Sequence, residues 1–185
     1  MCVNVAAMED GLGILIAELR DLKGKAFWQR LAVITRRKEF KEVEKGIYSA
    51  ITSGSSDYDC LLVAARKAKS FGYEVYILPN PKTIPSADFI FKNKNSYKLY
   101  ELKTIHGKKS VGNRLQSSIT QSSRVLLHFT ATYSPRRLAD EINHHFASFS
   151  DVKEVLLFYR HQQISIRRNN IGPNLWKGLT KNMKK

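Results

Sequence analysis

The chain has 185 residues and a hydrophobic fraction of 43%, which suit one globular domain with a small extension and exclude disorder throughout. No run reaches the roughly 18 apolar residues of a membrane helix, so no membrane partner is expected, and Cys2 and Cys60 match no disulfide framework or zinc spacing. The formal charge of +15, from 31 Lys and Arg against 16 Asp and Glu, indicates a phosphate-bearing partner.

The positive charge is concentrated after the first 79 residues. Residues 80–185 hold 19 Lys and Arg but only 6 Asp and Glu. Positive surroundings favour the ionised form of a carboxylate. Each of these few acids is therefore a candidate metal ligand if it faces a site.

The N-terminal part is predicted to be helical. Apolar residues recur at helical spacing over 12–22 and, less regularly, over 26–47. The serine-rich stretch at 52–56 is a break. We therefore expect a helical N-terminal extension over residues 1–51, followed by a core domain over 52–168.

The core domain is predicted to alternate strands and helices. A helix over 58–71 is followed by strands over 74–78, 87–91 and 97–105, a helix from Ser110 to about Ser122, a strand over 124–129, a helix over 135–149, and strands over 152–159 and 163–167. A helix between two strands implies a parallel pair, whereas the hairpin at 92–95 implies an antiparallel one. The expected class is α/β, with a mixed (α+β) sheet and helices on its faces. Residues 169–185 are expected to form a basic tail.

The predicted hairpin carries two carboxylates, Asp88 and Glu101, and a lysine two residues after the second, Lys103. Alternation on a strand puts Glu101 and Lys103 on one face, and the hairpin is expected to bring Asp88 beside them. Two carboxylates and the backbone carbonyl of Leu102 would form an oxygen site for Mg²⁺ or Mn²⁺. Lys103 would orient or deprotonate the attacking water, or stabilise charge on a phosphate. The alternative interpretation is an ordinary salt bridge of Lys103 with either acid.

This pattern, Asp88 followed by Glu101-Leu102-Lys103, resembles the PD-(D/E)XK nuclease superfamily, although Ala87 stands where a proline is usual. The run from Gly72 to Leu127 also resembles nuclease domains at the C-termini of bacterial contact-dependent inhibition and other polymorphic toxins, some of which cleave tRNA. The resemblance implies a restriction-endonuclease-like αβββαβ core and a metal-dependent nuclease, with RNA preferred over DNA. It also implies a cognate inhibitor, or immunity protein, as a further partner.

Other polar residues are expected to support this site. By the resemblance, Gln121 on the flank of the helix after Ser110 assists catalysis. Nucleic-acid contacts are expected from the end of the strand, the loop that leads into this helix and the helix itself: Thr104, His106, Lys108, Lys109 and Arg114. The competing interpretation is a solvated loop and an exposed polar helix face.

Two further functions remain open from the sequence. One is a basic nucleic-acid-binding module without catalysis, and the other is a metal-independent ribonuclease that uses His106, Lys103 and Arg114. Few cysteines and no secretion signal favour a cytoplasmic site of action. The sequence leaves open whether the chain stands alone or belongs to a longer secreted toxin or phage protein.

Overall fold

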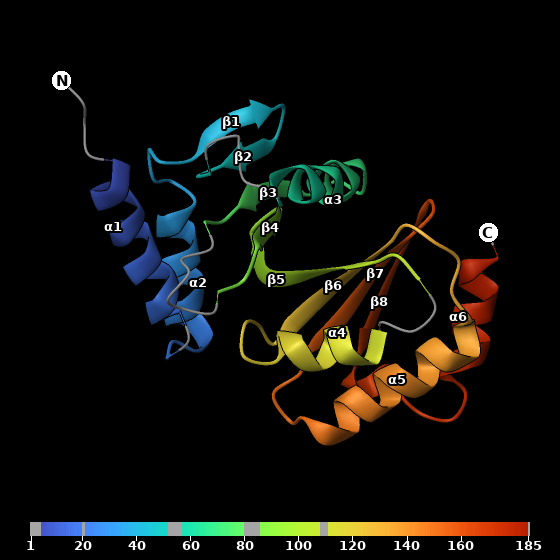
Figure 1. The fold of residues 1–185 in the computed structure, drawn as a ribbon. Coiled ribbons are helices and arrows are strands. Elements are labelled where there is room, and N and C mark those ends of the chain that lie inside the picture. The colour runs from blue at the N-terminus through green and yellow to red at the C-terminus, as the bar shows by residue number, and fades with distance from the viewer. Residues whose placement is uncertain (1–4, 20, 52–56, 80–85, 108–110, 185) are drawn as a thin grey trace. The chain divides into compact units, whose positions relative to one another are not determined.

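The computed structural model describes residues 5–19, 21–51, 57–79, 86–107 and 111–184 (Figure 1). The chain divides into two compact units, Met1–Leu99 and Tyr100–Lys185, and the division falls inside strand β5. Both units combine helices with strands, and both contain parallel and antiparallel pairs, which confirms the mixed α/β class. Among the described residues, no helix has the length and apolarity needed to span a bilayer.

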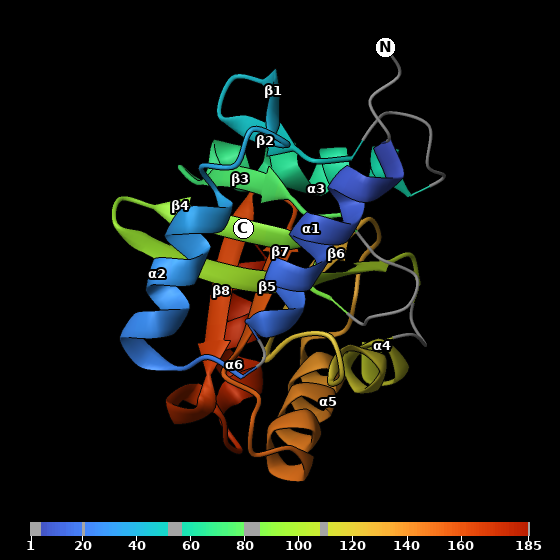
Figure 2. The same ribbon diagram turned by 90° about the vertical axis from the view of Figure 1, so that its left-hand side faces the viewer.

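The first unit builds its sheet from four short strands. Its elements are α1 (Val5–Glu18), α2 (Gly24–Ile34), β1 (Lys41–Glu44), β2 (Ile47–Ser49), α3 (Tyr58–Ser70), β3 (Glu74–Ile77) and β4 (Phe89–Asn93). Strand β2 is antiparallel to β1 and parallel to β3, and β3 is antiparallel to β4. Helices α1 and α2 lie on one side of β3 and α3 lies on the other, as Figures 1 and 2 show. Each face of β3 is thereby covered.

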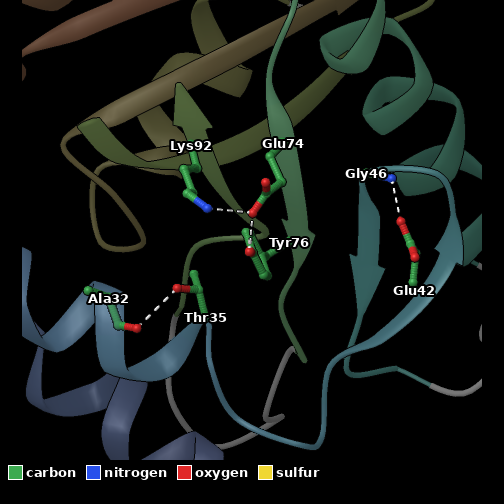
Figure 3. Close-up of polar contacts among 7 residues, drawn as sticks. All are labelled: Ala32, Thr35, Glu42, Gly46, Glu74, Tyr76 and Lys92. Carbon is green, nitrogen blue, oxygen red and sulfur yellow. Dashed lines mark hydrogen bonds and ion pairs between the residues drawn. The ribbon is translucent and has the colours of Figure 1, made fainter. Parts of the chain in front are cut away.

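The core between α1, α2 and the sheet follows from helical spacing. Leu12 and Ile16 of α1 and Leu31 of α2 are buried against Tyr76 and Ile90 of the strands. At the margin of this core, Lys92 donates a hydrogen bond of 2.8 Å to the Glu74 carboxylate, which also accepts one from the Tyr76 hydroxyl (Figure 3). The register places Lys92 opposite Glu74, so this is a cross-strand ion pair.

The predicted helix over 26–47 is wrong beyond Ile34, where α2 ends. A hairpin of β1 and β2 follows instead. Gly46 adopts a φ of +76°, which a glycine accommodates at a tight turn, and its N–H donates to the Glu42 carboxylate at 2.8 Å. Side chains alternate between the two faces of β2, and the Ile47 side chain lies on a face that is buried. The segment before residue 52 is therefore part helix and part sheet.

The second unit is built around parallel strands. Its elements are β5 (Ser96–Ile105), which begins in the first unit, α4 (Val111–Ser118), β6 (Arg124–Phe129), α5 (Pro135–Ser148), β7 (Glu154–Tyr159), β8 (Gln162–Arg167), the 3₁₀ turn η1 (Arg168–Asn170) and α6 (Leu175–Met183). Strands β5, β6 and β7 are parallel, with α4 and α5 as the crossovers that parallel neighbours need, and β8 is antiparallel to β7. Buried residues of α4, α5 and α6 pack with one face of this sheet.

The predicted basic tail over 169–185 is wrong. Its residues form η1 and α6, and Leu179 and Met183 are buried in the second core. Leu175 completes an apolar stripe at every fourth position, which is one face of a helix. The Arg168 guanidinium ties this segment to α5 by donating to the carbonyl oxygen of Phe146 at 2.9 Å. The polar composition of this segment favoured the prediction of a tail, but three apolar residues on one face are enough for the helix to pack on the core.

Candidate active site

The predicted pair on β5 is a buried ion pair. Lys103 Nζ lies 2.6 Å from Glu101 Oε1, as expected for side chains two residues apart on one face of a strand. The Glu101 side chain is 3% exposed and that of Lys103 is 12% exposed. Burying both charges costs several kcal/mol per ion before their attraction is counted. A pair kept in such a position is a candidate for a functional role.

The surrounding face of the sheet is apolar. Glu101 pairs in register with Val125 and Lys103 with Leu127, and Ile105 continues the same face of β5 into the second core. Hydrocarbon neighbours give the pair little solvation, which strengthens the attraction between its charges. The ammonium and the carboxylate must therefore satisfy each other and nearby polar groups.

Gln121 supplies one of these polar groups. Its side-chain Oε1 accepts a hydrogen bond of 2.9 Å from Lys103 Nζ. The helix predicted to reach about Ser122 ends at Ser118, so Gln121 lies in the turn that follows α4. Its backbone N–H donates to the carbonyl oxygen of Ser118 at 3.0 Å, which fixes that turn. The structure thus brings together Glu101, Lys103 and Gln121 in the second unit.

Asp88 belongs to the first unit. The predicted strand over 87–91 starts later, at Phe89, so Asp88 immediately precedes β4. Its side chain is half-buried, and its backbone carbonyl accepts from the Leu78 N–H at 2.9 Å. This hydrogen bond fixes the backbone of Asp88 next to the first residue of β4.

The expected nucleic-acid contacts have different surroundings. Arg114 is exposed on α4, whereas Thr104 is half-buried on the face of β5 opposite to Lys103. His106 is exposed just after β5, with its Nδ1 3.0 Å from the Thr130 hydroxyl. Lys108 and Lys109 lie outside the described residues. Of this set, Arg114 and His106 therefore present polar atoms to solvent.

The donors available for a metal are hard oxygens. Among the described residues there is no group of three or more His, Cys, Asp or Glu side chains that could hold a metal ion. The set expected here is smaller: one carboxylate each from Glu101 and Asp88, and the backbone carbonyl of Leu102. In chemistry this set suits Mg²⁺ or Mn²⁺, which keep several waters and need only one or two protein carboxylates.

A second buried charge cluster was missed by the sequence reasoning. Glu154, 3% exposed, begins β7 and lies between Arg124 of β6 and Arg167 of β8, its partners in register. Its carboxylate lies 3.4 Å from Arg124 Nε and accepts a hydrogen bond of 2.6 Å from Ser165. Local spacing contains no signal for it, because strand register is what brings Glu154 beside Arg124 and Arg167. Two arginines on one buried acid leave this end of the sheet positive.

Comparison with known proteins adds no relative. No family model, no curated protein and no solved structure matches the chain.

Proposed function

We propose that this protein is a metal-dependent nuclease of the PD-(D/E)XK type, with RNA preferred over DNA. The cluster of Glu101, Lys103 and Gln121 carries this proposal. A lysine held between a buried carboxylate and an amide oxygen has a fixed ammonium, which suits the orientation of a water molecule or the stabilisation of charge on a phosphate. Preference for RNA, tRNA included, rests on the resemblance alone.

In the second unit, a divalent metal would be held by Glu101 and the carbonyl of Leu102. Asp88 as a further ligand is a prediction from the resemblance. When bound, it would supply Lewis-acid stabilisation of the phosphate and a more acidic water. The residues of this chain would do the rest. Glu101 would share its charge between metal and Lys103, and Gln121 would keep the Lys103 ammonium directed toward the reacting water.

The order of elements supports the proposal. From α3 to β6 the chain runs α3, β3, β4, β5, α4, β6, which is the αβββαβ order expected from the resemblance. Strands β3 and β4 are antiparallel, and β5 and β6 are parallel across α4. The charge also supports it, because residues 100–185 hold 15 Lys and Arg against 5 Asp and Glu, a field that attracts a polyanion.

The test is a cleavage assay on total RNA and plasmid DNA with Mg²⁺, Mn²⁺ or EDTA. The parent protein is compared with Glu101→Gln, which keeps the shape of the side chain, and folding of the variant is checked by circular dichroism. Metal-dependent cleavage by the parent and none by Glu101→Gln is the expected result. No cleavage of either substrate by the parent would refute the proposal.

The same assay separates the other candidate functions. Cleavage that persists in EDTA would favour the metal-independent ribonuclease that uses His106, Lys103 and Arg114. Salt-dependent binding without cleavage would favour a non-catalytic module. Both stay alternatives, as does an inhibitor protein as partner, a prediction from the resemblance.

A further inference from the structure

A pocket lies in the second unit, beside helix α6. Its cavity volume is about 460 Å³, within the range of small-molecule sites. Apolar side chains of β8 and α6 line it, among them Ile164 and Leu175. Three asparagines also line it: Asn170, Asn174 and Asn182. An apolar surface with a few amides suits a flat, polar-edged ligand.

The chain segment that forms the pocket carries an excess of positive charge. Residues 155–185 contain seven Lys and Arg and no Asp or Glu. Lys177 and Lys181 are exposed on α6, next to the pocket-lining residues Gly178 and Asn182. Such a segment attracts phosphate groups in a salt-dependent way.

The loop that bounds the pocket is fixed to helix α5. Asn143 donates from its amide to the carbonyl oxygen of Gly172 and accepts from the Gly172 N–H, both at 3.0 Å. The Arg168 guanidinium, at the other end of the loop, donates to the carbonyl oxygens of Phe146 and Phe149. A pocket wall held at both ends is preorganised, so a ligand loses less binding free energy to ordering the protein.

The asparagines favour a nucleotide over the carboxylates of an acidic protein as the ligand. The amides of Asn174 and Asn182 each carry one acceptor and two donor hydrogens, the combination that pairs with the edge of a nucleobase. The Asn170 side-chain oxygen already accepts from the Arg167 N–H at 3.2 Å, so this residue offers its donors. Asn174 precedes α6 but makes no side-chain capping bond, so its amide is not used by the helix start. A carboxylate of an acidic protein would use only the donors. The apolar lining suits the face of an unstacked base.

We propose that this pocket binds one unstacked nucleotide of a single-stranded nucleic acid, with Lys177 and Lys181 contacting the adjacent phosphates. The inference rests on the proposed function, because it assigns to the same nuclease a substrate-holding site apart from Glu101 and Lys103. It makes single-stranded segments the preferred substrate.

Gly178 offers a direct test. A Cβ added at this position meets no atom within 4 Å, so the first carbon of a larger side chain fits without displacing the fold. Gly178→Phe is expected to occupy the pocket, and Gly178→Ala serves as the matched control. Binding of fluorescein-labelled eight-nucleotide RNA homopolymers is measured by fluorescence anisotropy in EDTA, where the proposed metal-dependent cleavage is blocked. Affinity should fall about 10-fold in Gly178→Phe, the effect of one lost base contact, and stay unchanged in Gly178→Ala.

A charge test accompanies it. The double variant Lys177→Gln and Lys181→Gln should weaken binding and reduce the slope of log affinity against log salt by about 1.4. The control double variant, Lys23→Gln and Lys25→Gln, removes two exposed lysines of the first unit and should leave both quantities unchanged. Parent-like affinity in Gly178→Phe would overturn the inference. Equal competition against the labelled RNA by polyglutamate and by an oligonucleotide of the same charge would also overturn it. That result would mean that the surface binds any polyanion, an acidic protein included.

The two proposals fail in different ways. Failure of the nuclease proposal is absence of cleavage by the parent protein in Mg²⁺ or Mn²⁺. Failure of the pocket proposal is unchanged binding in Gly178→Phe, whatever the cleavage result.

Discussion

Each unit of the protein carries a Lys–Glu pair on its sheet, and the two pairs differ in burial. In the first unit, Lys92 and Glu74 face each other across antiparallel strands at 2.8 Å, with side chains 29% and 33% exposed. In the second, Lys103 and Glu101 share one strand at 2.6 Å, and Glu101 is 3% exposed. A solvated cross-strand pair needs no explanation beyond the sheet, whereas a buried pair is retained at a cost.

The neighbours of the two pairs differ as well. Burial raises the pKa of Glu74, but hydrogen bonds from Lys92 and Tyr76 outweigh it and hold that pKa below its ordinary value. Burial, followed by the hydrogen bond to Glu74, raises the pKa of Tyr76, so its hydroxyl stays protonated. Gln121, whose amide carries no titrating proton, accepts a hydrogen bond from Lys103. The first pair is consistent with a structural role, and the second with a site that acts on a ligand.

The largest expected difference is in activity. Glu101→Gln should lower metal-dependent cleavage about 10³-fold or more, because several kcal/mol of charge stabilisation depend on the metal ligand. Glu74→Gln, the matched change in the first unit, should leave cleavage unchanged. Initial rates on a labelled RNA decide this, and equal loss in both variants would remove the functional distinction between the pairs.

Stability should follow the same order. Glu101→Ala leaves a buried ammonium without its carboxylate and should reduce the free energy of unfolding by about 3 kcal/mol. Glu74→Ala breaks a partly solvated pair and should cost less than about 1 kcal/mol. Urea titration monitored by circular dichroism gives both values. A cost for Glu74→Ala equal to that for Glu101→Ala would contradict the assigned difference in burial.

Acid should destabilise the second unit first. All five histidines lie after residue 100, and burial lowers the pKa of His145 to about 4. Since the unfolded chain takes up this proton near pH 6.5, the stabilisation is complete above pH 6.5 and declines as the pH falls toward 4. The expected loss is about 2 to 3 kcal/mol between pH 7.5 and 4.5, and His145→Leu should remove that dependence.

The two tryptophans allow each unit to be followed separately. Trp28 lies in α2 of the first unit and Trp176 in α6 of the second. Fluorescence of Trp28→Phe therefore reports the second unit, and that of Trp176→Phe reports the first. Between pH 6.5 and 5, the urea midpoint should move in the first variant alone. A shift in both would show that the units unfold together.

The smallest expected effect concerns Gln121. Gln121→Ala removes one hydrogen bond to Lys103 and should lower the rate of cleavage about 10-fold, mainly through the turnover number rather than substrate affinity. Gln121→Asn is expected to lose the same activity, because its amide oxygen lies one methylene group too far from Lys103 Nζ to accept the 2.9 Å hydrogen bond. Steady-state kinetics separate the two constants. A change in affinity alone would make Gln121 a binding residue instead.

Local patterns in the sequence were enough for much of this fold. The alternation of β5 placed Glu101 and Lys103 on one face, and the predicted order of elements from 58 to 167 is the order observed. These features depend on the spacing of neighbouring residues. The expectation for Gln121 came from the resemblance, since a helix flank alone does not select one polar residue among several.

Tertiary structure decided what local spacing does not contain. The segment from 41 to 49 became a hairpin because Ile47 could join β3, and α6 formed because Leu179 and Met183 had a core to cover. The burial of Glu154 by two register partners and the pocket beside α6 also depend on residues far apart in sequence. Periodicity thus predicted the type and order of the elements from 58 to 167. Strand partners, burial and pockets depend on tertiary packing. Apolar contacts between segments distant in sequence select among the local structures that each segment could form.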